Sequence, residues 1–260
     1  MPRPGHDARS GWAAAVTVAD PGGHFLSGLR RLEQPLRDLF DVGGAVVTDT
    51  TDREVVEFLG QLGWQIQAVQ PDGRVGRHRR QAVELASVAG IDTVLHSDLD
   101  HLLRWLEAAP EELAGSLRAP QADLLVVGRS DAAMARSPAR LRATEDPVNR
   151  IYALITGRPW DLLFAIRRLS ADLAAAIVAQ CREDSIASDL EWPLYAEQSG
   201  YRLAYLASDH LDYRAREDFD ARSDEQDGDP ALWIKRVEIA NLHAAVLKRY
   251  LGIRGHGSDA

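Results

Sequence analysis

The chain has 260 residues, of which 45% are hydrophobic and 27% charged, and its formal net charge is −9 at pH 7. This balance is typical of a globular protein, and the negative charge argues against a general nucleic-acid-binding surface. The single cysteine, Cys181, excludes an intrachain disulfide, and no apolar run reaches the length of a membrane span. Residues 1–11 lack the apolar stretch of a secretion signal, so we expect a disordered lead-in and a cytoplasmic protein.

Short apolar runs alternate with segments of helical periodicity in the first half of the chain. We expect strands at 12–19, 45–48, 64–69, 93–96 and 123–128, and helices at 25–40, 52–62, 77–88 and 102–117. Pro35 and Pro110 are expected to break the first and the last of these helices, and Gly43-Gly44 to end the first. Strands joined by helices of this length are typical of βαβ units, so the sequence predicts an α/β fold with a mostly parallel sheet.

The composition changes after Gly128. Residues 129–147 are rich in Arg, Ala and Pro and are expected to form a long loop with one short helix. Beyond it we expect helices at 147–157, 170–181, 190–199 and 230–251, strands at 162–166 and 201–206, and an acidic loop at 217–229. The last helix has a broad apolar face, which we expect to pack on its own domain, with a homodimer as the alternative. One domain is expected over 12–216, with halves at 12–128 and 129–216 and a loose tail at 252–260.

Two carboxylates follow the predicted strand 93–96. In an extended segment, Asp98 and Asp100 point to the same side, about 6.5–7 Å apart along the chain. Carboxylates at the carboxyl end of a strand can hold a hard divalent cation, and ligands bind at this edge of open α/β sheets. The alternative is that Asp100 caps the following helix and Asp98 is solvated beside it.

Three groups of residues, taken in chain order, carry a resemblance. They are Asp98-Leu99-Asp100; Asp123–Arg129 with Asn149-Arg150, Asp161 and Arg167-Arg168; and Ser188–Glu191 with Gly200–Leu203 and Tyr213-Arg214. Together they resemble GT-A glycosyltransferases of family 2, of the dolichol-phosphate-mannose-synthase-like type. The resemblance covers residues 12–216 and implies a three-layer α/β/α fold. Asp20-Pro21-Gly22-Gly23 replaces the family's usual first-strand motif, and Thr48–Asp52 keeps only part of the second acidic motif.

The resemblance implies a metal-dependent glycosyltransferase that moves a sugar from a nucleotide-diphosphate donor to a small or lipid-linked acceptor. The implied cofactor is Mg²⁺ or Mn²⁺, with Asp100 as a ligand and Asp98 near the metal or the ribose. His210 is a candidate third ligand, with an exposed loop histidine as the alternative. Asp49 and Asp52 stand where the family meets the base and ribose of the donor, and they equally suit the start of a helix.

The basic run Arg74–Arg80 stands at the start of a predicted helix, where cations oppose the helix dipole. We therefore expect it to bind the donor diphosphate, with Arg77 as the contact, and a solvated charged face is the alternative. Arg142 and Arg150 lie in the segment that meets the acceptor in the resembling fold. They suit a phosphorylated or carboxylated acceptor, unless this segment is simply a solvated loop.

An inverting transferase needs a base that takes the proton of the acceptor hydroxyl. The resemblance makes Asp189 and Glu191 the candidates, and Asp189 is the first choice. On a regular helix these two residues are about 200° apart, so at most one can face a given site. The alternative is that both are charges that favour a helix N-terminus.

Two other functions remain open at this point. A nucleotidyltransferase on the same layout needs a Gly-rich phosphate loop after the first strand, for which Pro21-Gly22-Gly23-His24 is the candidate. The altered first and second motifs also allow a GT-A-like protein that binds a ligand or a partner without turnover.

Overall fold

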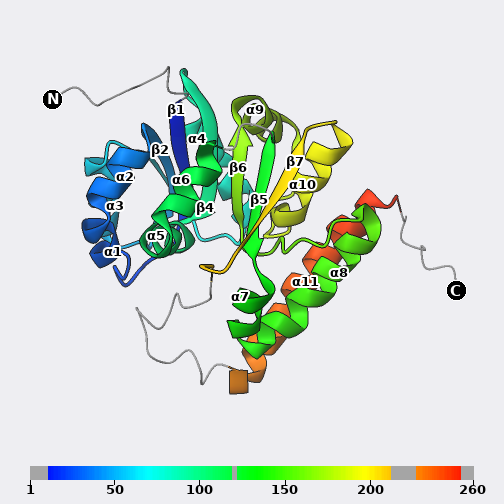
Figure 1. The fold of residues 1–260 in the computed structure, drawn as a ribbon. Helices are drawn as coiled ribbons and strands as arrows, with labels where there is room; N and C mark the ends of the chain where they lie inside the picture. Colours follow the sequence, from blue (N-terminus) through cyan, green and yellow to red (C-terminus); the bar gives the residue numbers. More distant parts are fainter. Residues whose placement is uncertain (1–10, 119–121, 212–226, 253–260) are drawn as a thin grey trace, which may run out of the picture.

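A seven-stranded sheet runs through the middle of the computed structural model, which describes residues 11–118, 122–211 and 227–252 (Figure 1). Its strands are β1 (Gly11–Val18), β2 (Val42–Thr48), β3 (Gln65–Val69), β4 (Ile91–Asp98), β5 (Leu124–Arg129), β6 (Ile166–Ser170) and β7 (Leu203–Ser208). Their spatial order is β3-β2-β1-β4-β6-β5-β7, and β6 is antiparallel to both of its neighbours while the other pairs are parallel. The prediction of a mostly parallel sheet is confirmed. The carboxyl ends of the six parallel strands therefore meet at one edge.

Helices cover both faces of this sheet, and α7 with the paired helices α8 and α11 extends away from it (Figure 1). The helices are α1 (Leu26–Arg31), α2 (Glu33–Leu39), α3 (Arg53–Gln61), α4 (Val75–Ala86), α5 (Leu99–Ala108), α6 (Pro110–Arg118), α7 (Asp131–Arg136), α8 (Ala139–Thr156), α9 (Ala171–Gln180), α10 (Ser188–Gln198) and α11 (Pro230–Tyr250). Side chains alternate across β1, so Ala14 and Val16 join the core under α1–α3, α5 and α6. Ala13 and Ala15 join the core under α4 and α8–α11. These two cores give the expected three layers.

Both prolines expected to break helices lie at helix starts. Pro110 opens α6, as predicted, and α1 ends at Arg31 just before α2 begins. Pro35 lies in the first turn of α2, where the missing N–H removes no helical hydrogen bond. The helical segment is therefore split, as expected, but the division falls before the proline at Leu32.

The prediction that Gly43 and Gly44 end a helix is wrong, because both lie inside β2. A Cβ on Gly44 would lie 2.7 Å from the backbone nitrogen of Ala86 and 2.8 Å from the carbonyl oxygen of Ala82. These glycines are strand residues that let neighbouring groups approach closely, with α4 against Gly44 and the Trp64 ring against Gly43.

Two elements in the second half also differ from the prediction. Helix α8 begins at Ala139, so residues 139–146 are helical where a loop was expected. Strand β6 occupies 166–170 instead of 162–166. Both segments carry charged side chains that are buried, such as Glu145, Arg167 and Arg168, and a pattern of apolar residues does not reveal them.

The last helix, α11, begins at Pro230 as expected, with Asp229 as its N-cap. It packs against α8 and α10 and buries His243, Val246 and Leu247. Packing on its own domain is thus confirmed for one face. Ile234 and Val237 remain 62% and 58% exposed, and a homodimer through this exposed face stays a prediction.

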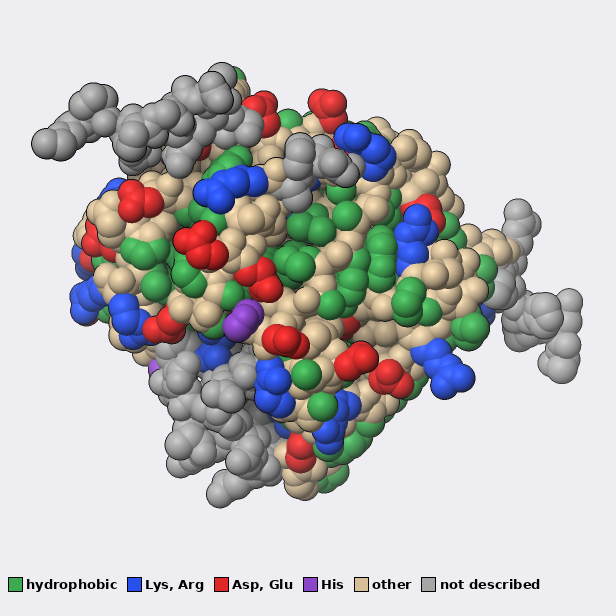
Figure 2. Space-filling model, viewed as in Figure 1, with side chains coloured by type: hydrophobic (Ala, Val, Ile, Leu, Met, Phe, Trp, Pro, Cys, Tyr) green, Lys and Arg blue, Asp and Glu red, His purple; other side chains and the backbone are tan. Residues whose placement is uncertain are grey.

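Charges of both signs are spread over the surface, and on the face seen in Figure 2 they surround an area of apolar side chains. In the part of the chain that the structure describes, no helix combines the length and hydropathy needed to cross a bilayer. Residues 1–10, 217–226 and 253–260, where we expect a lead-in, an acidic loop and a tail, lie outside the described residues, as does Tyr213-Arg214.

Burial makes the thiol of Cys181 unreactive. The side chain is 1% exposed, and burial raises the pKa of the thiol from its ordinary value of 9.0 to about 12. The unfolded chain therefore ionises first, so this group costs stability as the pH rises from 9 towards 12. At pH 8.5 we expect 5,5′-dithiobis(2-nitrobenzoic acid) to modify the native protein at least about 100-fold more slowly than the urea-unfolded protein. Equal rates would show that the thiol is not shielded.

Candidate active site

A cavity of about 490 Å³ lies at the carboxyl ends of β1 to β4, and we call it the β1–β4 cavity. One part of its lining is apolar and includes Phe25, Val46, Val69, Pro71 and Val75. The polar part consists of Thr17, Thr48, His78, Asp98 and Asp100. The volume suits a small organic ligand, and this lining can receive a flat apolar group together with a charged one.

Both acids of the predicted metal pair line this cavity, but not in the expected geometry. Asp98 is the last residue of β4, whereas Asp100 already lies in the first turn of α5. The expectation of an extended Asp98–Asp100 segment is wrong, because the helix begins at the fully buried Leu99. Asp98 is the N-cap residue without a capping hydrogen bond from its side chain, which makes contacts elsewhere.

The two carboxylates differ in their surroundings. Asp98 accepts a hydrogen bond from Thr17 Oγ1 at 2.5 Å and one from Arg79 Nη2 at 3.1 Å. Although burial opposes the charge, Arg79 and the nearby histidines hold the pKa of Asp98 below its usual value, so it is ionised at neutral pH. Within the described residues, Asp100 makes one ion pair, with His101, whose Nε2 lies 3.7 Å from Oδ2. Asp100 therefore keeps more capacity for an added cation.

Oxygen ligands of this kind fit Mg²⁺ or Mn²⁺. In the described segments there is no group of three or more His, Cys, Asp or Glu side chains placed to hold a metal ion. The pair therefore suits a cation that takes its remaining ligands from a diphosphate and water. His210 is exposed beyond the end of β7 and lines neither this cavity nor the one described below, and its role as a third ligand stays a prediction.

Asp49 and Asp52 lie outside the lining of the β1–β4 cavity. Asp49 is exposed and accepts a hydrogen bond from Gln70. The carboxylate of Asp52 accepts the backbone N–H of Glu54 at 2.8 Å and caps α3. The structure thus shows the helix-start role for Asp52, and donor contacts of both residues stay predictions.

The basic run is used mainly within the protein. The backbone N–H groups of Gly76 and Arg77 donate to the carbonyl of Asp184 at 2.8 and 3.4 Å, so the start of α4 already has an internal acceptor. Arg77 itself is exposed and does not line the cavity, whereas His78 does. Burial lowers the pKa of His78, so this ring is neutral near pH 7. Arg79 points into the protein and is 2% exposed.

Asp20, which replaces part of the family's first motif, organises the turn after β1. Its carboxylate accepts the backbone N–H groups of His24 at 3.0 Å and Phe25 at 2.8 Å, which places Phe25 at the cavity. Gly22, Gly23 and His24 are not among the lining residues. The Gly-rich part of this turn therefore lies outside the cavity lining, and the nucleotidyltransferase alternative stays for experiment to decide.

Asp189 and Glu191, both in the first turn of α10, face different groups, as the helical geometry predicts. Asp189 is 6% exposed and accepts a hydrogen bond from Arg79 Nη1 at 2.7 Å. Glu191 accepts the backbone N–H groups of Arg182 and Glu183 at 2.8 and 2.9 Å. Neither residue lines the β1–β4 cavity or the cavity at the ends of β5 and β7.

A second cavity, of about 690 Å³, lies at the carboxyl ends of β5 and β7, and we call it the β5–β7 cavity. Its acidic lining residues are Asp131, Asp146, Asp161 and Asp209. Arg150, one of the two predicted acceptor residues, lines it, but Arg142 does not. The guanidinium of Arg142 donates to the carbonyl of Ala135 at 2.7 Å.

A buried ion cluster supports this second cavity. Arg129, whose side chain is 1% exposed, donates to Asp161 at 2.7 Å and to Glu145 at 2.5 Å. Asn149 donates to Asp161 at 2.9 Å. Although burial opposes both charges, the ion pair lowers the pKa of Asp161 and raises that of Arg129. The resemblance contained Arg129, Asn149 and Asp161 but gave them no role.

The sequence interpretation missed several residues of the β1–β4 cavity, among them Thr17, Phe25 and His78. Thr17 is a polar residue near the end of an apolar strand, and His78 follows Arg77 directly, so both carried a weak positional signal. Phe25 carried none, because an aromatic residue at a helix start is ordinarily part of a core.

The sheet order, the helices on both faces and the acidic end of β4 define the GT-A glycosyltransferase fold, so the predicted fold class is confirmed. The sequence matches no protein-family model and no curated protein. Among solved structures, Mycobacterium tuberculosis glucosyl-3-phosphoglycerate synthase is similar with a TM-score of 0.62 and 13% identity, over 98% of this chain and 88% of that chain.

Its complex with Mn²⁺, UDP-glucose and phosphoglyceric acid gives a TM-score of 0.63 at 13% identity, over 96% of this chain and 82% of that chain. A structure described as that of a mycobacterial protein gives a TM-score of 0.63 at 14% identity, over 95% of this chain and 76% of that chain. Identities this low establish the shared fold and nothing finer.

Proposed function

We propose that this chain is a metal-dependent glycosyltransferase that uses a nucleotide-diphosphate sugar. The observation that carries the proposal is the β1–β4 cavity, which combines an apolar wall with Asp98 and Asp100 at the carboxyl edge of a GT-A sheet. The wall that includes Phe25 would receive the base of the nucleotide. The two acids would receive the metal-bound diphosphate and the ribose.

For the donor we propose a UDP-sugar with Mn²⁺ or Mg²⁺. The structurally similar synthase has been solved with UDP and Mg²⁺, and with UDP-glucose and Mn²⁺. In this chain Asp100 would be the main metal ligand, with Asp98 beside it. A bound cation would stabilise the negative charge that develops on the leaving diphosphate.

For the acceptor we propose the β5–β7 cavity, which lies along the same sheet edge. Strand β6, which lies between β4 and β5 in the sheet, separates the two cavities. Its lining contains two arginines and four aspartates, and Arg129 is paired with Asp161. That leaves Arg150 against Asp131, Asp146 and Asp209. Carboxylates accept hydrogen bonds from hydroxyl groups and repel phosphate, so this lining favours a neutral polyhydroxyl acceptor over a phosphorylated one. A lipid-linked acceptor with an exposed sugar is the alternative.

A thermal-shift and calorimetric screen tests the proposal. UDP-glucose, GDP-mannose, ADP-glucose and a CMP-sugar are each added with and without Mn²⁺. We expect Mn²⁺-dependent stabilisation by one nucleotide class, about 2.7 kcal/mol at a ligand concentration of 100 Kd. Stabilisation by a nucleoside triphosphate with release of pyrophosphate would instead indicate a nucleotidyltransferase. Metal-independent binding without loss of the sugar would indicate a binding protein.

A further inference from the structure

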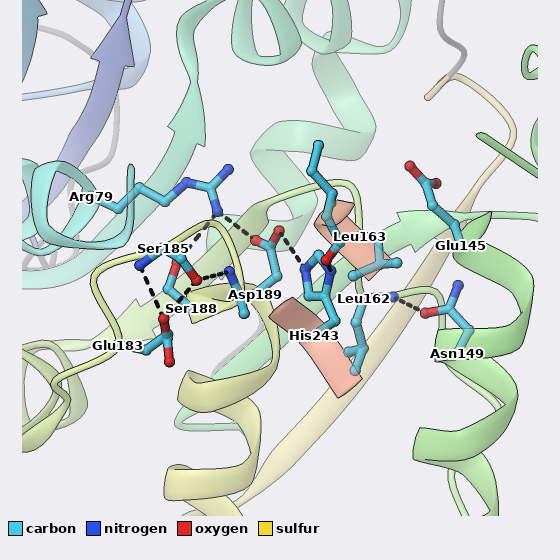
Figure 3. Close-up of polar contacts among 12 residues, drawn as sticks. Arg79, Glu145, Asn149, Leu162, Leu163, Glu183, Ser185, Ser188, Asp189 and His243 are labelled. Atoms are coloured by element: carbon cyan, nitrogen blue, oxygen red, sulfur yellow. Dashed lines mark hydrogen bonds and ion pairs between the residues drawn. The ribbon is translucent and has the colours of Figure 1, made fainter. Parts of the chain in front are cut away.

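Five elements meet in a chain of polar contacts that starts at the β1–β4 cavity. Thr17 on β1 donates to Asp98 Oδ1 at 2.5 Å, and Arg79 Nη2 on α4 donates to Asp98 Oδ2 at 3.1 Å. The other terminal nitrogen of Arg79 donates to Asp189 Oδ1 on α10 at 2.7 Å. His243 on α11 places Nε2 3.8 Å from Asp189 Oδ2, an ion-pair distance rather than a hydrogen bond (Figure 3).

Arg79 is at the centre of this series of polar contacts, and its buried position requires anionic partners. Its side chain is only 3% exposed, and a buried guanidinium without a carboxylate is strongly unfavourable. It has two carboxylate partners, and both follow it in the sequence: Asp98 is 19 residues away and Asp189 is 110 residues away. Of the two, only Asp98 lines the cavity.

The contacts fix the carboxylate of Asp98. Each of its oxygens accepts one hydrogen bond from a buried or partly buried side chain, so the plane of the carboxylate is held from two sides. Arg79 also offsets much of its negative charge. Asp98 is therefore suited to accept hydrogen bonds in a defined direction. Asp100 has no guanidinium partner in the described part of the chain, so it is the stronger attractor for a cation.

The same contacts limit what Asp189 can do. One of its oxygens is bound to Arg79 and the other faces His243, and its backbone carbonyl accepts a hydrogen bond from Arg167 Nη2 at 3.2 Å. Asp189 is buried and lines neither cavity. A general base has to be within hydrogen-bond reach of the proton that it takes, directly or through one water.

From this geometry we infer that Arg79 is a positioning residue of the donor site and that Asp189 is its buried counter-ion, not the base of the reaction. The inference rests on the proposed function. Arg79 acts through Asp98: it sets the orientation of that carboxylate toward the bound nucleotide and metal. Asp189 acts one step further away, because it keeps the guanidinium in place.

The test compares Arg79→Gln, Arg79→Lys, Asp189→Asn and Thr17→Val with the wild-type chain. Affinity for UDP with Mn²⁺ is measured by calorimetry, stability by urea unfolding, and kcat and KM by UDP release from UDP-glucose. Arg80→Gln is the matched control, since Arg80 is the adjacent residue of α4 and binds Asp184 without contacting Asp98.

We expect Arg79→Gln to weaken the binding of UDP with Mn²⁺ by about 10- to 100-fold, and Arg79→Lys to restore part of the loss. Asp189→Asn and Thr17→Val should raise the Kd by about three- to tenfold. Asp189→Asn should leave kcat within about threefold of wild type, whereas loss of a general base would lower kcat by about 10²- to 10⁴-fold. Arg80→Gln should change stability but not the Kd.

Each outcome bears on a definite claim. If Arg79→Gln does not fold, Thr17→Val and Asp189→Asn still decide the matter. Unchanged Kd values in these folded variants would show that the polar contacts around Arg79 have only a structural role. This result would overturn the inference and leave the proposed function standing. A collapse of kcat in Asp189→Asn at unchanged Kd would make Asp189 the base. A wild-type chain that binds no nucleotide overturns the proposed function and this inference with it.

Discussion

Replacing Asp100 with Asn should abolish the Mn²⁺-dependent part of UDP binding. Asp100 lines the β1–β4 cavity, and among the residues that the structure describes it pairs with His101 alone, at 3.7 Å, so its charge is available to a cation. Asn keeps the size and one oxygen but removes the charge that a hard cation requires. At 100 Kd of UDP with Mn²⁺, wild type should gain about 2.7 kcal/mol of stability, and the variant should gain almost none. Urea unfolding with and without ligand measures both values.

The matched control is Asp172→Asn. Asp172 occupies the first turn of α9 as Asp100 occupies the first turn of α5, and it lines neither cavity. Both substitutions remove one favourable charge at a helix N-terminus, so their effects on the unliganded protein should be similar. An Asp100→Asn variant that keeps the Mn²⁺-dependent gain would exclude Asp100 as a metal ligand.

Replacing Arg129 with Met should cost about 3–5 kcal/mol of the free energy of unfolding. The side chain is 1% exposed, and its removal leaves Asp161 without its cation and Glu145 with Arg236 alone, in surroundings that disfavour charge. The pKa of Glu145 is already raised, because burial outweighs its cationic neighbours. Equilibrium urea unfolding at pH 7 gives the change in free energy.

Arg202→Met provides the control for an arginine–carboxylate pair at the surface. Arg202 binds Asp123 at 3.2 Å, but its side chain is 67% exposed. Solvent therefore screens the attraction between the two charges, and the pair adds little to the free energy of unfolding. Its stability should stay close to that of wild type. If the two variants proved equally stable, burial of the Arg129 cluster would not be what stabilises this part of the fold.

Local sequence patterns predicted the parts of the fold that apolar residues define. Strands β1 to β5 and the helices between them follow from apolar runs and helical spacing. Strand β6 and the first half of α8 were not predicted correctly, because their buried positions carry charged side chains instead of apolar ones. Arg167 and Arg168 donate to the carbonyls of Leu162 and Ala122, and Glu145 binds Arg129. These partners become visible only once the chain is folded.

The candidate site was likewise predictable only where a local sequence pattern marks its residues. Asp98 and Asp100 were found because a strand end before a helix marks the ligand edge of the sheet. The sequence could not show which arginine of the basic run faces the site, because successive arginines on a helix point in different directions. The choice of Arg77 was therefore not secured by the sequence. Which of these arginines faces inward depends on Asp98 and Asp189, and the second of these lies 110 residues away.

The contact between Arg79 and Asp189 also bears on how such a protein can be rearranged in evolution. The arginine belongs to the segment before Gly128 and the aspartate to the segment after it, so the two halves are not independent modules. A recombinant that takes its second half from a relative without an acid at this position inherits a buried guanidinium with one partner fewer. We therefore expect positions 79 and 189 to change together among homologues.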